Sequence, residues 1–202
     1  EKDGFPPLKI TGKKLYGGRI EIDGSISSQF ISALLLIAPK FGDELEIILK
    51  GNIVSAPYIK MTIELLKLFG IYVAFNGNKI VISPSKFMMD NDQVLIESDW
   101  SAASYWYGMV ALSENAEVEL RFLDKFSLQA DSVLPEIYNN LGVKTEFIDK
   151  GIRLTNKKVV EVEFSYDFTN CPDIAQTIAV TCFGLGIKST LRGLQTLKIK
   201  ET

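Results

Sequence analysis

The sequence predicts an α/β (α+β) protein built from repeated βαβαββ units. Alternating strand-like segments and helix-like segments follow one another in a fixed order, and this order recurs along the chain with a period of about 70 residues. Gly70 and Gly142 end equivalent helices in the first two copies. Apolar residues make up 47% of the 202 residues, which is enough to fill a core. Such a period is longer than that of solenoid repeats, so each copy is interpreted as a compact unit.

The first copy shows all six elements. Its predicted elements are, in order, strand 18–23, helix 27–41, strand 43–51, helix 55–70, strand 71–75 and strand 79–83. The second helix has Ser55 in the N-cap position and Gly70 as its stop. Asn76-Gly77-Asn78 between the last two strands is typical of a β-hairpin turn.

The remaining sequence repeats this order. The second copy is predicted as strand 93–98, helix 101–114, strand 116–123, helix 130–142, strand 143–148 and strand 151–156. A third copy begins with strand 159–167, helix 171–186 and strand 188–193. The sequence ends soon afterwards and starts at Glu1, so we expect a segment of a longer protein.

Residues 83–93 are the least periodic part of the chain and contain Pro84 and a polar cluster. This predicts a boundary between two domains, residues 1–91 and residues 92–202. The alternative is one continuous α/β domain with a long loop at this position.

Composition excludes several classes of function. Histidine is absent, which rules out Ser-His-Asp and Cys-His triads and most zinc sites. A net charge of −3 gives no reason to expect nucleic acid or an anionic membrane as a partner. The longest apolar run is shorter than the roughly 20 residues that span a bilayer. Cys171 and Cys182, if on one helix, lie about 16 Å apart, too far for a disulfide. A reducing cytoplasm is the expected location.

Small polar residues mark the predicted helix starts. One helix begins at Ser27-Ser28-Gln29, the next at Ser55 with Tyr58 in its first turn, and a third at Cys171-Pro172-Asp173. Helix N-termini offer unpaired N–H groups and partial positive charge, and with serine hydroxyls they form a phosphate cradle. The alternative is that these serines only cap their helices, and that Asp173 only complements a helix dipole.

Six segments together resemble one family, the 5-enolpyruvylshikimate-3-phosphate synthases, which are 3-phosphoshikimate 1-carboxyvinyltransferases. These segments are residues 24–39, 54–62, 98–106, 170–180, 189–194 and 198–202. The resemblance covers essentially the whole chain. It implies the enolpyruvyl transferase fold, an inside-out α/β barrel whose two domains each contain three βαβαββ units. This chain would hold the last unit of the first domain, then the first unit and the start of the next unit of the second domain.

The resemblance also implies roles for named residues. Ser27, Ser28 and Ser55 would bind the 3-phosphate of shikimate 3-phosphate, and Gln29 would contact both this substrate and phosphoenolpyruvate. Tyr58 would pack near the shikimate ring. Asp173 would hold the ring hydroxyls and accept the proton of the attacking 5-hydroxyl. Lys200 would contact shikimate 3-phosphate, and Glu201 would protonate the methylene carbon of phosphoenolpyruvate.

The implied reaction is addition followed by elimination, in the shikimate pathway that leads to chorismate and the aromatic amino acids. Two carboxyl groups in different environments can divide the acid and base roles, which suits a histidine-free enzyme. No cofactor or metal is expected, and the parent protein is expected to be a cytoplasmic monomer whose partners are its two small-molecule substrates.

The sequence departs from the family pattern in two ways. Thr196 stands where many members have Asn, and its hydroxyl would offer one hydrogen bond to shikimate 3-phosphate. The family's N-terminal Lys-Ser and Gly-rich segments and several later cationic residues are not in this sequence, so we expect the chain alone to be inactive. The alternatives are UDP-N-acetylglucosamine 1-carboxyvinyltransferase, which shares the fold, and a non-catalytic module that binds a phosphorylated metabolite.

Overall fold

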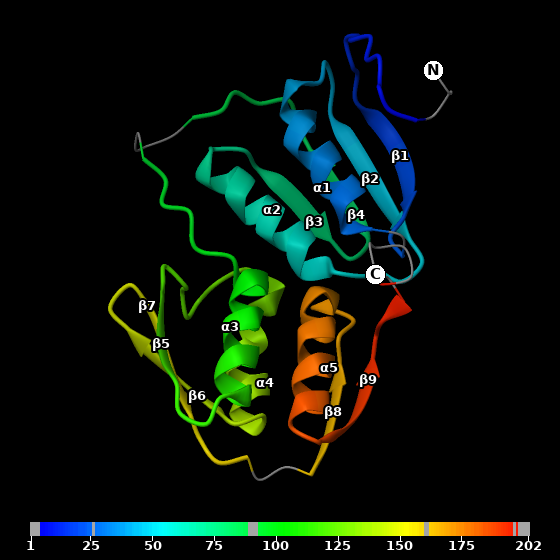
Figure 1. Ribbon diagram of the computed structural model, residues 1–202. Coiled ribbons are helices and arrows are strands. Elements are labelled where there is room, and N and C mark those ends of the chain that lie inside the picture. Colours follow the sequence, from blue (N-terminus) through cyan, green and yellow to red (C-terminus); the bar gives the residue numbers. More distant parts are fainter. Residues whose placement is uncertain (1–4, 26, 89–92, 160–161, 196, 198–202) are drawn as a thin grey trace.

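The computed structural model describes residues 5–25, 27–88, 93–159, 162–195 and 197. Helices and strands alternate along the chain and pack in two regions, which we call the first half (residues 5–88) and the second half (residues 93–197) (Figure 1). The mixed α/β class predicted from the sequence is confirmed.

The first half has the predicted βαβαββ order. Its elements are β1 (Gly18–Asp23), α1 (Ser28–Ile37), the short 3₁₀ helix η1 (Ala38–Lys40), β2 (Leu45–Lys50), α2 (Ala56–Leu68), β3 (Val73–Asn76) and β4 (Lys79–Ile82). The four strands form one sheet in the order β1-β2-β4-β3. β1 and β2 are parallel, whereas β4 is antiparallel to both β2 and β3. Both helices cover the same face of this sheet (Figure 1).

Glycine and proline set the ends of these elements. Gly70 follows α2 with a φ of 73°, and the N–H of Ile71 donates back to the Leu66 carbonyl, as in a Schellman motif. The predicted helix 27–41 ends earlier, because Pro39 cannot donate a helical hydrogen bond and the last turn becomes η1. Gly77, with a φ of 59°, turns β3 into β4, which confirms the predicted hairpin.

The second half contains most of the second unit and the start of a third. Its elements are α3 (Trp100–Leu112), β5 (Glu117–Arg121), η2 (Ala130–Val133), α4 (Leu134–Asn140), β6 (Val143–Ile148), β7 (Gly151–Asn156), β8 (Glu163–Asp167), η3 (Pro172–Ile174), α5 (Ala175–Gly184) and β9 (Lys188–Arg192). β5, β7 and β6 form an antiparallel sheet in this order. β8 and β9 pair in parallel, as β1 and β2 do.

The predicted strand 93–98 is wrong, because these residues are irregular in the structure. The Ser98 N–H donates to the Phe122 carbonyl at 2.7 Å, a bond that matches Gly24 N–H to Lys50 carbonyl at the end of β1 and β2. Only Ser98, the last residue of this segment, therefore occupies a place that corresponds to the first strand, β1, of the first half. Leu95 is 82% exposed. An apolar pattern alone does not form a strand when no neighbouring strand pairs along it.

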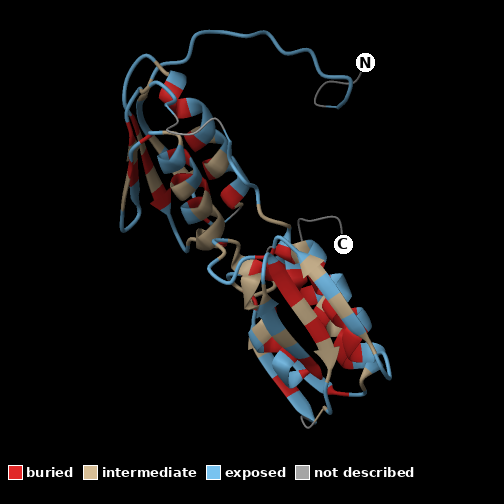
Figure 2. Cartoon of the chain, turned by 90° about the vertical axis from the view of Figure 1, so that its left-hand side faces the viewer, coloured by how far each residue is buried: buried red, intermediate tan, exposed pale blue. Residues whose placement is uncertain are grey.

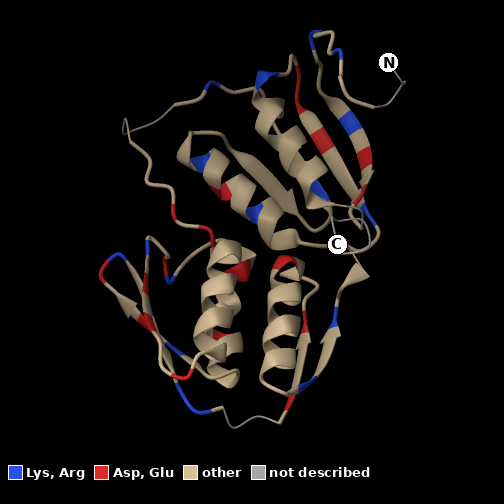
Figure 3. Cartoon of the chain, viewed as in Figure 1, with Lys and Arg blue, Asp and Glu red and all other residues tan. Residues whose placement is uncertain are grey.

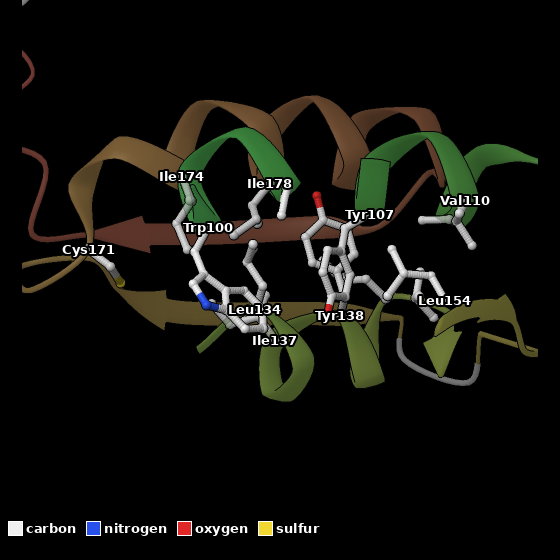
Figure 4. Packing of buried hydrophobic residues seen from close by; sticks show 14 of the residues in the cluster. Trp100, Tyr107, Val110, Leu134, Ile137, Tyr138, Leu154, Cys171, Ile174 and Ile178 are labelled. Atoms are coloured by element: carbon white, nitrogen blue, oxygen red, sulfur yellow. The ribbon is translucent and has the colours of Figure 1, made fainter. Parts of the chain in front are cut away.

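Each half has its own hydrophobic core. One cluster of buried residues extends from Ile31 to Ile82 and the other from Trp100 to Ile187. Figure 2 shows buried positions concentrated between the helices and strands of each half. In the second core, Tyr107 and Tyr138 pack with ring centroids 5.0 Å apart (Figure 4). The predicted domain boundary at residues 91 and 92 lies outside the described residues and stays a prediction.

A further apolar surface is exposed on two packed helices of the second half. α3 presents Tyr105, Trp106 and Met109, and α5 presents Val180 and Phe183, of which Phe183 is 88% exposed. We call this surface the apolar helix face. Among the described residues, no helix has the length and apolar character needed to cross a membrane.

Candidate functional site

The predicted site residues that the structure describes lie at or beside helix starts, and four helices begin where the two halves face each other. α1 and α2 begin at the end of the first half that is nearest to the second half (Figure 1). α3 and α5 begin at the opposing end of the second half. Each of these helices has ten or thirteen residues, long enough for its N-terminal N–H groups and dipole to act on a ligand.

Backbone and side-chain bonds hold the starts of α1 and α2 side by side. The Val54 N–H, just before α2, donates to the Gly24 carbonyl, just before α1, at 3.1 Å. One to two turns further along, the Thr62 hydroxyl donates to the Ser32 Oγ at 2.9 Å. These bonds follow from the parallel pairing of β1 and β2, which brings the two following loops to one edge of the sheet.

At the start of α1, Ser27 is the N-cap residue. Its Oγ accepts a hydrogen bond from the Gln29 N–H at 3.2 Å. Ser28 is buried, whereas the Gln29 side chain is exposed. The capping interpretation is therefore confirmed for Ser27. A capping serine keeps a lone pair and its proton, so capping leaves room for a second, ligand-binding role.

At the start of α2, Ser55 behaves differently from the prediction. It holds the N-cap position, but its side chain forms no capping hydrogen bond. Its backbone is left-handed, with φ of 53° and ψ of 35°, whereas a capping residue is extended. The capping interpretation is therefore wrong for Ser55. A buried serine held in a left-handed conformation is strained, and such strain is common at ligand clamps.

The structure brings Tyr58 of the first half to Asp173 of the second. The Tyr58 hydroxyl donates to Asp173 Oδ2 at 3.4 Å and to Asp131 Oδ2 at 3.3 Å. Burial raises the pKa of Tyr58 far above its ordinary value, and the nearby carboxylates Asp131 and Asp173 add to this shift. The phenol is therefore a hydrogen-bond donor throughout the physiological pH range.

Asp131 and Ser101 are absent from the residues predicted to form the site. Asp131 lies in η2 and is 0% exposed, and its Oδ2 accepts from the Ser101 hydroxyl at 2.5 Å. Burial raises the pKa of Asp131, and repulsion from Asp173 acts in the same direction. Sequence offered only a weak signal, since an acidic residue in a first helical turn is common.

The electrostatics of the two halves differ where they face each other. The first turns of α1 and α2 contain no acidic residue. The second half places Asp99 at the N-cap of α3 and Asp173 in η3, ahead of α5. Figure 3 shows acidic positions at the ends of α3 and α5 that face the first half. An anion therefore meets least repulsion at the starts of α1 and α2.

The other predicted site residues, Thr196, Lys200 and Glu201, lie outside the described residues. Within the described ranges, no group of three or more His, Cys, Asp or Glu residues could hold a metal ion. The described geometry offers N–H donors for an anion on one side and a carboxyl group, Asp173, on the other. This combination can bind a phosphorylated molecule and accept a proton from it.

Comparison with known proteins gives a consistent result. The family model for "EPSP synthase (3-phosphoshikimate 1-carboxyvinyltransferase)" matches residues 1–202. A 3-phosphoshikimate 1-carboxyvinyltransferase of Bacteroides fragilis is 44% identical over 99% of this chain and 48% of the relative. One from Shewanella pealeana is 36% identical over 100% of this chain and 47% of the relative. The chain thus spans about half the length of the curated relatives it matches.

A solved structure shows the same fold. The EPSP synthase of Acinetobacter baumannii aligns with a TM-score of 0.58 at 18% identity, over 85% of this chain and 39% of that chain. A family-model match over the full length, together with relatives above 30% identity across the chain, settles the family. This chain belongs to the EPSP synthase (3-phosphoshikimate 1-carboxyvinyltransferase) family.

Proposed function

We propose that the complete protein, meaning a polypeptide of the relatives' length that includes this chain, is a 3-phosphoshikimate 1-carboxyvinyltransferase. It transfers the carboxyvinyl group of phosphoenolpyruvate to the 5-hydroxyl of shikimate 3-phosphate and releases phosphate. The observation that carries this proposal is the contact between Tyr58 and Asp173, 3.4 Å apart, which joins predicted site residues from both halves.

In this proposal the first half binds the phosphate. Ser27, Ser28 and Ser55, at the adjoining starts of α1 and α2, hold the 3-phosphate with the free N–H groups of those helices. Gln29, whose side chain is exposed beside Ser28, reaches both substrates. The absence of acidic residues from the first turns of α1 and α2 supports this assignment.

The second half supplies the proton acceptor. Asp173 takes the proton of the 5-hydroxyl of shikimate 3-phosphate while the oxygen of that hydroxyl bonds to C2 of phosphoenolpyruvate. Glu201 delivers a proton to the C3 methylene. The tetrahedral intermediate then loses phosphate from C2 and a proton from C3, which restores the double bond. Lys200 and Thr196 contact shikimate 3-phosphate. Asp173 is exposed, as a group that meets a substrate must be.

We further propose that residues 1–91 and 92–202 belong to two domains that close on the substrates. The separate cores of the two halves support this division. The protein acts as a cytoplasmic monomer. Two free, buried cysteines are compatible with a reducing compartment.

The test is Asp173→Ala in the complete protein. We expect kcat to fall about 100- to 10,000-fold, since a general base contributes about that much. Asp149→Ala, in the exposed turn between β6 and β7, is the control and should leave kcat unchanged. Undiminished turnover in Asp173→Ala would contradict the proposed role. A wild-type protein that used UDP-N-acetylglucosamine instead, or that bound shikimate 3-phosphate without turnover, would overturn the proposed function.

A further inference from the structure

Asp131 combines complete burial with incomplete hydrogen bonding. Its Oδ2 accepts from Ser101 and Tyr58, whereas its Oδ1 is buried and has no hydrogen-bond partner. A carboxylate has about four acceptor sites, and a buried carboxylate with few of them filled is costly. A carboxyl group kept in such a place merits a functional explanation, because an apolar side chain of similar size would pack there at lower cost.

Hydrogen bonds between the segment before Asp131 and the start of α3 fix the location of this carboxyl group. The Gln129 side chain accepts from the Trp100 N–H at 2.8 Å and donates to the Ser98 carbonyl at 2.8 Å. These bonds join the segment before Asp131 to the start of α3. Ser101 lies in the first turn of α3, where the Asp99 carboxylate accepts from its N–H at 2.9 Å. Contacts within the second half therefore hold Asp131 beside Ser101 without a contribution from Tyr58.

The start of α5 is tied to the same frame. The Ser104 hydroxyl of α3 donates to Thr177 Oγ1 of α5 at 3.1 Å. Further along, the Tyr138 hydroxyl of α4 and Thr181 of α5 are hydrogen-bonded at 2.9 Å. These contacts tie α5 to α3 and to α4. They fix where Asp173, just ahead of α5, lies relative to Asp131.

Tyr58 is the only residue of this group that comes from the first half. A phenol has one proton, so Tyr58 can donate fully to only one of Asp131 and Asp173 at a time. Asp131 is fully buried and Asp173 is exposed. A hydrogen bond shielded from water is electrostatically stronger, so the proton points mainly toward Asp131. In this arrangement the Tyr58 hydroxyl still lies 3.4 Å from Asp173 Oδ2, so its position limits where the Asp173 carboxyl group can lie.

We propose that Asp131 is a positioning residue: by accepting the Tyr58 hydroxyl it anchors the first half on the second and aligns Asp173 for proton transfer. We call these three residues the Asp131 latch. Its role in catalysis rests on the proposed function, but the latch itself is a property of this chain. Asp131 acts through Tyr58 and touches no reacting atom.

The titration behaviour of Asp131 gives the latch a direct signal. Four groups face its carboxyl group: Tyr58 from α2, Asp99 ahead of α3, and Cys171 and Asp173 ahead of α5. Burial raises the pKa of Asp131, whereas the hydrogen bonds from Ser101 and Tyr58 lower it. Removing the Tyr58 hydroxyl should therefore raise this pKa further, because a bond that favours the charged form is lost.

The first experiment measures this signal in the chain itself, by NMR titration of ¹³C-labelled aspartate carboxyl groups. In Tyr58→Phe we expect the midpoint of Asp131 to move upward. Tyr105→Phe also removes one phenolic hydroxyl, from an exposed tyrosine on α3, and should leave the midpoint in place. An unchanged midpoint in Tyr58→Phe would show that the hydrogen bond does not form in solution and would overturn the latch.

The second experiment measures kcat and KM in the complete protein. Asp131→Leu removes the acceptor and should lower kcat about tenfold, the effect of one hydrogen bond. Asp131→Asn keeps an acceptor oxygen, so we expect its kcat to stay within about threefold of the wild type. Because Asp131 acts through Tyr58, the double variant Asp131→Leu/Tyr58→Phe should be no slower than the slower single variant. Effects that multiply, or a kcat unchanged in Asp131→Leu, would refute the positioning role.

The two experiments separate the latch from the proposed function. A complete protein without carboxyvinyl transfer would disprove the function while the titration still tested the latch. Thermal melting of each variant identifies a variant that has lost its fold. If Asp131→Leu does not fold, the titration of Tyr58→Phe in the chain decides alone, with the same two outcomes.

Discussion

At the residue scale, Ser55 and Lys150 both have a positive φ, but in different surroundings. Ser55 has a φ of 53° at the start of α2, and Lys150 has a φ of 59° in the turn between β6 and β7. A side chain in the left-handed region costs about 1–2 kcal/mol, which glycine avoids. At Lys150 the positive φ helps the chain turn from β6 into β7. At Ser55 it stands in place of the extended conformation of a normal helix cap.

We therefore predict that Ser55→Gly separates stability from ligand binding. The free energy of unfolding should stay the same or rise by up to about 1 kcal/mol. Relief of the backbone strain stabilises the folded state, and the greater entropy that glycine gives the unfolded chain offsets part of this gain. Binding of shikimate 3-phosphate to the complete protein should weaken at least about tenfold, since a hydrogen bond to a charged phosphate is lost. Chemical denaturation and calorimetric titration measure the two effects.

Lys150→Gly is the matched control for this prediction. It should change stability in the same direction as Ser55→Gly and leave binding unchanged. If Ser55→Gly bound the substrate as tightly as the wild type, Ser55 would have no ligand role.

Asp131 makes stability depend on pH in an unusual direction. Burial raises its pKa in the folded protein above the ordinary value of 3.8, so the folded state binds a proton more tightly than the unfolded state. Its contribution is therefore fully present below the unfolded pKa and is lost as pH rises through the folded pKa. We predict that Asp131→Asn gains stability relative to the wild type as pH rises above the ordinary aspartate pKa of 3.8. Denaturation curves at several pH values measure the difference; a constant difference would contradict the prediction.

At the level of single residues, the sequence indicated side chains at helix starts but not side chains that matter through burial. Tyr58 and Asp173 were predicted as neighbours of one ligand, and they do contact each other. Ser101 and Asp131 lie 30 positions apart on different elements, and no local pattern links them. Ser55 was predicted to cap α2, but backbone conformation overrides its side-chain preference. Tertiary contacts decide these cases.

At the element scale, the two hairpins show how differently a turn glycine can be constrained. Gly77, in the β3–β4 turn, has open space where a Cβ atom would lie. Gly151, which begins β7, would place a Cβ atom 2.2 Å from the Leu120 backbone carbonyl oxygen on β5. Gly77 is needed only for the backbone conformation of its turn, whereas Gly151 lets β5 and β7 lie close to each other.

We predict that Gly151→Ala destabilises the chain more than Gly77→Ala. Gly77→Ala should cost about 1 kcal/mol, the price of a left-handed alanine. Gly151→Ala should cost about 3 kcal/mol or more, because β5 must move away from β7. Urea denaturation of both variants measures the difference. Equal losses would mean that the β5–β7 pairing relaxes without cost.

The sequence predicted most helices and strands, but it could not establish which segments pair with each other as strands. The order of helices and strands in the first half follows from apolar periodicity and from glycine stops at Gly70 and Gly77. Residues 93–98 have an equally apolar pattern, yet they form no strand because only Ser98 is bonded to the residue after β5. Periodicity reports what a segment can bury, whereas pairing depends on what lies beside it.

At the scale of the whole molecule, the second half exposes apolar side chains on two packed helices. The apolar helix face contains aromatic side chains that are about half exposed or more. Exposed apolar side chains that gather into a patch are typical of interfaces. Because the chain spans about half the length of its relatives, residues outside it are available to cover this face in the complete protein.

We predict that the chain alone has no measurable carboxyvinyl transferase activity. The chain spans about half the length of the relatives it matches, so about half of a relative's residues have no counterpart in it. A coupled assay for phosphate release, with shikimate 3-phosphate and phosphoenolpyruvate, measures this. The complete protein at equal concentration is the positive control, and product formed by the purified chain would contradict the prediction.

Opposite local charges across the interface between the halves imply a dependence on salt. The first turns of α1 and α2 contain no acidic residue, whereas Asp99 and Asp173 lie at the facing end of the second half, so we expect an attraction between the halves even though the whole chain is anionic. Mobile ions screen such attraction beyond about 8 Å at physiological ionic strength. Concentrated salt should therefore loosen the empty molecule. A phosphate ester bound as proposed would occupy these positive helix starts itself, so we expect the liganded molecule to depend less on the attraction between the halves and more on direct contacts to the ligand.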